Sequence, residues 1–321
     1  MFNTTGIRSK LDSMNLLLIA EGAAGIRTLQ LLRQMNHCIV AIMTSFSVDS
    51  AASMWSSAAE LGYETWSSKL VRDPSFANRV RDHKVDMILN VHSLVVMCRD
   101  VLEAPILGSY NLHPGPLPRY AGLNSVCWAI YRGERTHGVT LHRIEPKIDS
   151  GPIACQETVE IGREETGLSL TMKCIAVGVP MLGQFLEAIS RNPSDIRQVP
   201  QNLSKREYFG RGVPENGELS WERTAQQVFD FVRACDFLPF QSPWGHPLTT
   251  LRDCELGILK ARLTGRPATA SPGTVGEVSD LGAEIACADE WILVRHLLRF
   301  GKRVPAFTLL QPGDQLQRRA V

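Results

Sequence analysis

The sequence predicts an α/β protein with a mostly parallel sheet in a first domain and a smaller β-barrel in a second domain. Three observations support this fold class. Apolar runs alternate with amphipathic stretches from Met14 onward, which is the pattern of β-α-β units. A polar segment with glycines and a proline interrupts this pattern over residues 201–217. Short apolar runs separated by glycine turns then follow, and these are typical of a small barrel.

At 321 residues the chain is long enough for two hydrophobic cores, so we expect domains at residues 14–200 and 218–315, joined by a linker at 201–217. Continuous aliphatic runs predict strands at Asn15–Ala20, Cys38–Thr44, Val85–Val91 and around Asn111 and Thr140. Apolar residues at helical spacing predict helices at Ile26–Met35, Ser50–Leu61, Pro74–Lys84, within Val96–Ala104, and at Leu123–Tyr131 and Leu168–Ile189. Met1–Ser13 is expected to be a flexible extension.

The second domain is expected to begin with a helix at Ser220–Cys235, which Ser220 and Glu222 would cap. The strands expected after it are Leu248–Leu251, Leu256–Thr264, Gly276–Val278, Ala283–Ala288 and Trp291–Leu298. Their short length and their glycine turns indicate a barrel rather than an open sheet.

Composition argues against several classes of protein. The chain has 34 basic and 33 acidic residues, so its net charge of +1 supplies no global field for nucleic acid. Eight scattered cysteines without a Cys-x-x-Cys pair indicate reduced thiols and a cytoplasmic protein. The apolar run Leu16–Ala20 is too short for a signal peptide or a membrane span. Gly22 and Gly25 lack the first glycine of a dinucleotide fingerprint, so we expect no nicotinamide site.

The chemistry is concentrated between residues 110 and 153. Asn111 and His113 are two positions apart, so on a strand their side chains face one way, and Pro114-Gly115-Pro116 ends that strand. A second β-branched run leads into a turn that carries Asp149. The other histidines show no metal-ligand spacing, and we expect no metal site. Among them, His137 and His142 are expected as strand residues that flank the site, and the remaining ones as structural or surface residues.

This constellation resembles the formyltransferase family that takes a formyl group from 10-formyltetrahydrofolate. The sequence matches the family pattern in order at Asn111, His113, Leu117-Pro118, Gly122, Gly138-Val139-Thr140 and Asp149-Ser150-Gly151. More loosely, residues 217–221, 232–234 and 272–275 resemble the C-terminal domain of methionyl-tRNA and aminoarabinose formyltransferases. The resemblance implies a Rossmann-like first domain and an OB-like barrel.

The resemblance implies that Asn111, His113 and Asp149 are catalytic. An amine that attacks a formyl carbon creates an oxyanion, which a preorganised donor such as the Asn111 amide stabilises by roughly 3 kcal/mol. His113 titrates near neutrality and can carry the amine proton to the leaving folate nitrogen. Asp149 is expected to raise the pKa of this histidine and to fix its tautomer. No covalent intermediate is required.

The expected formyl donor is 10-formyltetrahydrofolate. By resemblance, its pterin ring lies in an apolar slot that also offers free backbone groups. The residues implied for one wall of this slot are Leu94, Val95, Val96 and Val101, and those implied for the other wall are Glu145 and Ile148.

Two departures from methionyl-tRNA formyltransferases favour a small amine as acceptor. Thr44–Leu61 contains no lysine or arginine where those enzymes carry a basic loop, and His113 is followed by Pro-Gly-Pro. A tRNA acceptor would need phosphate contacts. We therefore expect a nucleotide-linked amino sugar or an amino-acid-derived amine, such as a siderophore or other natural-product precursor. The expected acceptor contacts are Arg119, Tyr120 and Asn124.

No nucleic-acid or membrane partner is expected, and the oligomeric state is open. Three alternatives also remain open: a methionyl-tRNA formyltransferase, a formyltetrahydrofolate hydrolase with water as the nucleophile, and a folate-binding regulator without activity. Formate release would indicate the hydrolase. Loss of a catalytic residue would indicate the regulator, and Asn111, His113 and Asp149 are all present.

Overall fold

The computed structural model describes residues 13–45 and 53–318. Most of the expected extension Met1–Ser13 and the start of the expected helix Ser50–Leu61 lie outside the described residues. The chain packs as two compact units, each made of separate segments. The first comprises Met1–Gly122, Gly138–Val159 and Lys173–Tyr208, and the second comprises Leu123–His137, Glu160–Met172 and Phe209–Val321. Because the units interleave along the chain, the domain limits at 14–200, 201–217 and 218–315 stay a prediction.

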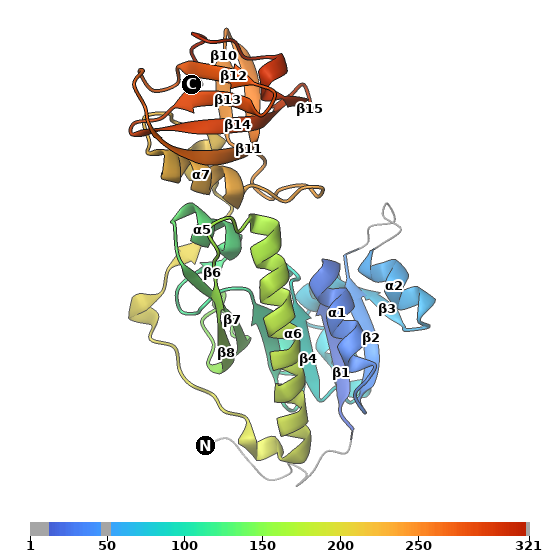
Figure 1. The fold of residues 1–321 in the computed structure, drawn as a ribbon. Helices are drawn as coiled ribbons and strands as arrows, with labels where there is room; N and C mark the ends of the chain where they lie inside the picture. Colours follow the sequence, from blue (N-terminus) through green and yellow to red (C-terminus); the bar gives the residue numbers. More distant parts are fainter. Residues whose placement is uncertain (1–12, 46–52, 319–321) are drawn as a thin grey trace. The chain divides into compact units, whose positions relative to one another are not determined.

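A seven-stranded sheet forms the centre of the first unit (Figure 1). In spatial order, its strands are β3 (Thr65–Ser67), β2 (Cys38–Thr44), β1 (Asn15–Ala20), β4 (Met87–Val91), β5 (Ser109–His113), β7 (Thr136–Arg143) and β8 (Ile153–Glu160). All pairs from β3 to β5 are parallel, and β7 runs antiparallel to β5. The mostly parallel sheet predicted from the sequence is therefore confirmed.

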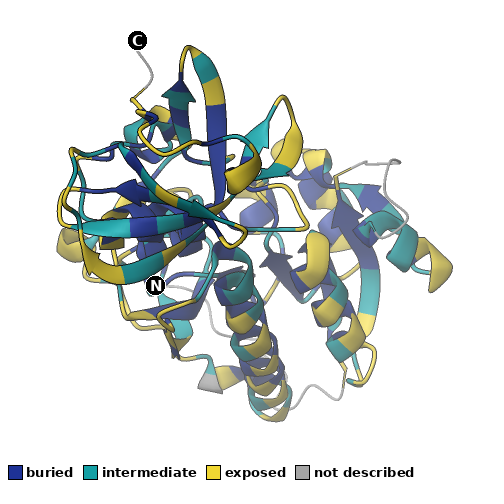
Figure 2. Cartoon of the chain, turned by 45° about the horizontal axis from the view of Figure 1, so that its top comes forward, coloured by how far each residue is buried: buried dark blue, intermediate teal, exposed yellow. Residues whose placement is uncertain are grey.

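Buried strands at the middle of this sheet explain its continuous aliphatic runs. Every residue of β4 is buried, and so are five of the six residues of β1. Buried residues are dark blue in Figure 2. Strands that are covered on both faces need apolar residues at every position rather than at alternate ones. The one polar residue of β4 is Asn90, next to its carboxyl end.

The α-helices are α1 (Gly22–Leu32), α2 (Met54–Glu60), α3 (Phe76–Asp82), α4 (Arg99–Leu102), α5 (Ser125–Tyr131), α6 (Gly167–Arg191) and α7 (Ala225–Ala234). Short 3-10 turns lie at Ser68–Arg72, Pro193–Asp195, Leu203–Lys205, Pro214–Gly217 and Ala306–Thr308. Helix α1 begins four residues before the expected start at Ile26, directly after β1, because the Gly25 amide already donates to the Glu21 carbonyl at 3.1 Å.

Among the described residues, α6 is long and apolar enough to cross a membrane by length and composition. However, 56% of its apolar window is buried in the protein, as in the core helix of a globular fold. Gly178 in α6 lets the helix approach the sheet, because a Cβ there would lie 2.8 Å from Val139 Cγ1.

Six strands of the second unit form an antiparallel sheet in the order β10-β11-β14-β13-β12, with β15 paired to β14. They span Leu248–Leu251 (β10), Cys254–Pro267 (β11), Val275–Ser279 (β12), Gly282–Ala286 (β13), Glu290–Arg299 (β14) and Lys302–Pro305 (β15). The C-terminal segment bridges both edges, because Thr250 pairs with Gln317 and Thr274 pairs with Gln315. The sheet therefore closes into a barrel. A separate two-stranded sheet joins β6 (Ala121–Gly122) and β9 (Tyr208–Phe209).

The expected start of α7 at Ser220 is wrong. The helix begins after Thr224, whose hydroxyl accepts from the Gln227 amide while the Gln227 side chain accepts from the Thr224 amide. This capping box satisfies donors that the first helical turn leaves open. Trp221 stays outside the helix, with its indole N–H donating to Thr249 Oγ1 at 3.0 Å.

Five strands were not expected from the sequence: β3, β8 and β15, and the two-residue strands β6 and β9. β8 is half exposed without a regular alternation of buried and exposed residues, and β3 and β15 have three and four residues. Pattern reasoning needs either alternation or a longer apolar run, so these strands carry no local signal.

Candidate active site

The three predicted catalytic side chains meet at the carboxyl end of β5. Asn111 and His113 project from β5, and Asp149 reaches them from the loop between β7 and β8. His113 Nδ1 lies 3.5 Å from Asp149 Oδ2, and Asn111 Nδ2 donates to Asp149 Oδ1 at 3.4 Å. The imidazole and the carboxylate are both largely shielded from solvent, with side-chain exposures of 5% and 9%.

The Asp149 loop is held in place by residues that are distant in sequence. Asp149 has a left-handed backbone with φ of 51°, and its Oδ2 accepts from the Gly122 amide at 2.8 Å. Gln201 Nε2 donates to the Asp149 carbonyl at 3.1 Å, and Arg206 donates to the Ile148 carbonyl at 2.9 Å. Sequence analysis placed Gln201 and Arg206 in a linker, since no local pattern shows that they contact a loop some 50 residues earlier.

The contacts of His113 define its tautomer. Its Nε2 lies 2.7 Å from the Tyr120 carbonyl, which can only accept, so Nε2 carries a hydrogen and donates. In a neutral ring the basic lone pair is then on Nδ1, which faces Asp149. Gly115 is required beside this ring, because a Cβ at position 115 would lie 2.6 Å from His113 Nε2.

Asp149 raises the pKa of His113, as expected, but the net shift of this histidine is downward. Burial lowers the pKa of His113, and this effect outweighs the opposite effects of Asp149 and of the Tyr120 carbonyl. Nearby His142 lowers it further. The ring is consequently neutral at pH 7, which is the protonation state of a base.

Asp149 stays ionised in spite of its burial. Burial alone would raise its pKa, but His113, His142 and the Gly122 amide together hold the pKa of this carboxyl well below its usual range. Donors reach both oxygens: Asn111 contacts Oδ1, and Gly122 contacts Oδ2. A carboxylate satisfied in this way keeps its charge next to the imidazole.

His142 belongs to the cluster rather than flanking it. The antiparallel register places His142 opposite Asn111, and its Nε2 lies 3.3 Å from Asp149 Oδ1. Its Nδ1 donates to the Arg143 carbonyl at 2.8 Å, so in a neutral ring Nε2 accepts from Asn111 Nδ2 at 3.2 Å. Sequence analysis missed this role, since the pairing of β5 with β7 decides which β7 residue faces the site.

His92 is a second histidine that sequence analysis left outside the site. It follows β4 with a left-handed backbone of φ 55°. Burial, together with the nearby His113, lowers the pKa of His92 to about 4. It is therefore neutral at pH 7.

The residues implied for the pterin slot differ in exposure. Leu94 and Val96 are 77% and 54% exposed, whereas Val95 is half-buried. Val101 is 0% exposed inside the hydrophobic core, so a ligand could touch it only if its neighbours moved. Across the loop, Glu145 is exposed and Ile148 is 41% exposed.

The residues expected to contact the acceptor are also placed unequally. Arg119 is half exposed and lies 3.5 Å from Glu207 in an ion pair. Tyr120 is 1% exposed, and it reaches the cluster through its carbonyl rather than its ring. Asn124 is half-buried at the start of α5 and belongs to the second unit.

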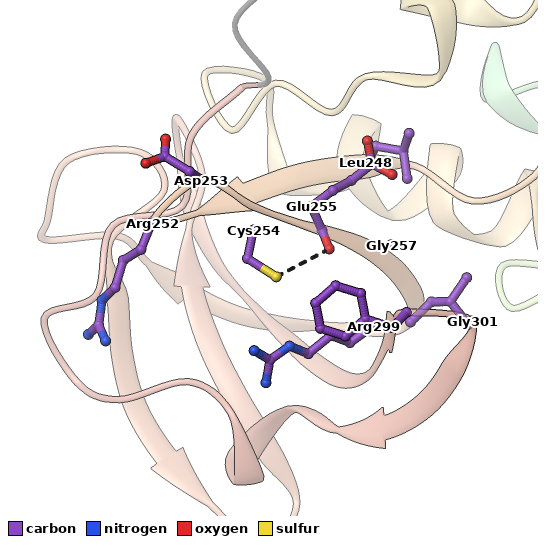
Figure 3. Close-up of a pocket in the computed structure, with 10 residues that line it drawn as sticks. Leu248, Arg252, Asp253, Cys254, Glu255, Gly257, Arg299 and Gly301 are labelled. Atoms are coloured by element: carbon purple, nitrogen blue, oxygen red, sulfur yellow. Dashed lines mark hydrogen bonds between the residues drawn. The ribbon is translucent and has the colours of Figure 1, made fainter.

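A cavity of about 590 Å³ lies elsewhere, on the barrel of the second unit (Figure 3). Two hairpin turns line it, one with Arg252 and Asp253 and the other with Phe300 and Gly301. Its lining includes none of the residues expected at the site. We therefore base the functional argument on the Asp149 cluster and not on this cavity.

Comparison with solved structures identifies the fold. An N-formyltransferase from Helicobacter canadensis, in complex with folinic acid and dTDP-3-aminofucose, is 19% identical with a TM-score of 0.68, over 88% of this chain and 98% of that one. HypX from Aquifex aeolicus, in complex with tetrahydrofolic acid, is 19% identical with a TM-score of 0.65 over 92% of this chain, which spans only 47% of HypX. Methionyl-tRNA formyltransferase from Clostridium thermocellum is 15% identical with a TM-score of 0.57, over 78% and 94% of the two chains.

Structural similarity at such low sequence identity shows only the fold. The family is assigned from family models that match the sequence. The formyl transferase model matches residues 32–184, and the model of the formyl transferase C-terminal domain matches residues 213–311. Together they match more than three quarters of the chain, in the order expected for one protein. The chain belongs to the formyl transferase family.

Proposed function

We propose that this protein is an N-formyltransferase that moves a formyl group from 10-formyltetrahydrofolate to the amine of a small biosynthetic metabolite. The observation that carries the proposal is the buried cluster in which Asn111 and His113 meet Asp149. It contains an amide donor, a neutral base and a carboxylate, which are the groups needed to move a formyl group between two nitrogens.

In this proposal His113 Nδ1 takes the proton of the attacking amine. The hydrogen bond from Nε2 to the Tyr120 carbonyl leaves Nδ1 as the basic atom. The lowered pKa of His113 keeps that atom free of a proton at pH 7. Asp149 Oδ2, at 3.5 Å from Nδ1, stabilises the imidazolium once the proton has arrived. The same nitrogen then returns the proton to the leaving folate nitrogen.

Asn111 is the proposed donor to the developing oxyanion. One of its N–H groups makes a long contact of 3.4 Å to Asp149, and the other faces His142 at 3.2 Å. The formyl oxygen would replace the longer contact, where little hydrogen-bond energy is lost. A donor of this kind is worth about 3 kcal/mol in the transition state.

The surface next to the cluster suits a folate. Leu94 and Val96 offer exposed apolar area, and Val95 packs against the core that contains Val101. Glu145 and Ile148 are exposed residues of the loop that carries Asp149. A pteridine ring needs such an apolar surface together with backbone donors and acceptors. The complexes of the Helicobacter enzyme with folinic acid and of HypX with tetrahydrofolic acid support a folate donor.

The acceptor is proposed to be a nucleotide-linked amino sugar or an amino-acid-derived amine, in a cytoplasmic protein. The net charge of +1 and the lack of basic residues in Thr44–Leu61 argue against tRNA. The Helicobacter enzyme was crystallised with an amino-sugar nucleotide, which supports the same class. Arg119 and Asn124 are the proposed side-chain contacts, while Tyr120 contributes its backbone.

A panel of amines with 10-formyltetrahydrofolate tests the proposal. The expected result is a mass gain of one formyl group on a small amine, with no formate released in its absence. Formate release without any formylated amine would replace the proposal by a hydrolase. Rapid formylation of methionyl-tRNA, with a rate that falls steeply as salt increases, would replace it by the translational enzyme. A protein that binds folate without turnover would be a regulator.

A further inference from the structure

Asn90 is a buried polar residue in an otherwise aliphatic strand. β4 reads Met87-Ile88-Leu89-Asn90-Val91, and Asn90 is 6% exposed. Within the described residues, its Oδ1 is enclosed and has no hydrogen-bond donor. Leaving a buried acceptor unsatisfied destabilises the fold. A leucine or valine would suit this central strand better, so stability does not explain the asparagine.

The amide nitrogen of Asn90, in contrast, donates two hydrogen bonds. Its Nδ2 donates to the Ser93 carbonyl at 3.3 Å and to Asn111 Oδ1 at 3.1 Å. Because the Ser93 carbonyl can only accept, it determines which end of the Asn90 amide faces β5. The parallel register places Asn90 directly beside Asn111, so the donor is aimed at the neighbouring strand.

This contact fixes the orientation of the Asn111 amide. With its oxygen held by Asn90, the Asn111 Nδ2 faces Asp149 Oδ1 at 3.4 Å and His142 Nε2 at 3.2 Å. Rotation of the amide by 180° would place its oxygen against the ionised carboxylate and would remove the N–H donors from the cluster. Asp149 favours the same orientation, and the donor of Asn90 on the oxygen side of the Asn111 amide adds to that preference.

We propose that Asn90 is a positioning residue that keeps the Asn111 N–H groups directed at the reacting formyl oxygen. The inference rests on the proposed function, in which Asn111 donates to the oxyanion. It also accounts for the unsatisfied Oδ1, because a polar core residue that weakens the fold persists where it serves the site. Asn90 itself touches neither substrate in this account.

Asn90→Leu separates positioning from structure. It removes the unsatisfied acceptor but also takes a donor from the Ser93 carbonyl and from Asn111 Oδ1, so the free energy of unfolding should change little. We expect kcat to fall about tenfold while KM for both substrates changes less than threefold, because only transition-state stabilisation is lost. Asn90→Asp serves as a second variant of the same shape, since an ionised carboxylate cannot donate to Asn111 Oδ1. Ile88→Val, in the same strand, should leave kcat unchanged.

A double-mutant cycle gives the decisive readout. In the Asn111→Ala background, Asn90→Leu should lower kcat no further, since the amide that it positions is already gone. Additive losses would overturn the inference, as would a normal kcat in both folded Asn90 variants. If Asn111→Ala alone leaves kcat unchanged, the proposed oxyanion role fails first, and the positioning role fails with it. The two failures are therefore distinguishable.

Discussion

Two largely buried aspartates, one in each unit, have pKa values that are shifted in opposite directions. Asp230 in the second unit receives a hydrogen bond from Arg233 Nε at 2.7 Å, yet burial raises its pKa more than Arg233 lowers it. Asp149 in the first unit lies next to His113 and His142 and accepts hydrogen bonds on both oxygens, and its pKa is well below the usual range. For Asp149, attraction to His113 and His142 together with hydrogen bonds lowers the pKa more than burial raises it, whereas for Asp230 the effect of burial is larger.

Arg233 and His113, the partners of the two aspartates, also differ in whether they can exchange a proton. The guanidinium of Arg233 is permanently charged and also donates to the Glu165 carbonyl, so this pair holds backbone segments together. The imidazole of His113 can gain or lose a proton, and Asp149 changes the energy of that step. A buried carboxylate next to a titratable ring is therefore suited to proton transfer, whereas one next to arginine is suited to structure.

Removing the titratable partner should have the largest effect. His113→Ala is expected to lower kcat about a thousandfold, because a general base in a cluster of this kind contributes 10²–10⁴-fold. The protein should still unfold cooperatively, with a loss of about 1–2 kcal/mol for the hydrogen bond to the Tyr120 carbonyl. Steady-state kinetics and urea unfolding measure both quantities. The exposed His83, changed to alanine, is the control. Near-normal turnover in the folded His113→Ala variant would remove the proposed base.

Neutralising each aspartate tests the comparison directly. Asp149→Asn should lower kcat about a hundredfold with a smaller change in stability, since the charge that stabilises the imidazolium is lost. Asp230→Asn should instead destabilise the protein by about 3 kcal/mol, because Arg233 is left buried without its counter-ion, while kcat per folded molecule stays unchanged. Kinetics and chemical unfolding on both variants give the answer. If both variants lost kcat and stability to the same extent, the two aspartates would not differ in role.

The smallest expected effect is on the pH dependence of stability. As the pH falls below 6.5, an unfolded His92 binds a proton, but the folded one does so only near its pKa of about 4. The unfolded state therefore binds more protons in this window, and stability falls with pH by at most about 3 kcal/mol. His92→Asn should reduce that loss, since asparagine tolerates the left-handed backbone. Urea unfolding at pH 7 and pH 4.5 measures the loss of stability in the wild-type protein and in the variant. An equal loss in both proteins would show that His92 does not contribute.

Local sequence patterns were sufficient to predict much of the fold. Asn15–Ala20, Cys38–Thr44 and Leu248–Leu251 form strands with the predicted limits, because their apolar runs end at turn residues or at polar residues. Helix α6 extends one residue before and two residues beyond the predicted Leu168–Ile189. Strands without a periodic pattern, such as β8, were missed, and the start of α7 depended on a cap at Thr224 rather than at Ser220.

The residue types of the site could be predicted, but its electrostatics could not. Asn111, His113 and Asp149 stand out through spacing and turn chemistry, and the structure brings them together. The raising effect of Asp149 on the His113 pKa was predicted, but the larger lowering effect of burial was not, because burial depends on how every neighbouring element packs. A sequence lists the charges near a group but not the solvent that folding removes.

By itself, the sequence determined which strands are buried and which three side chains are the candidates for the site, because strand periodicity and turn residues act over a few neighbouring positions. Only the tertiary structure decided that His142 faces Asp149, that Gln201 and Arg206 hold the Asp149 loop, and that Asn90 orients Asn111. These contacts join residues that are 7 to 58 positions apart in the sequence. Such pairs form through strand register and loop packing, which no local pattern encodes.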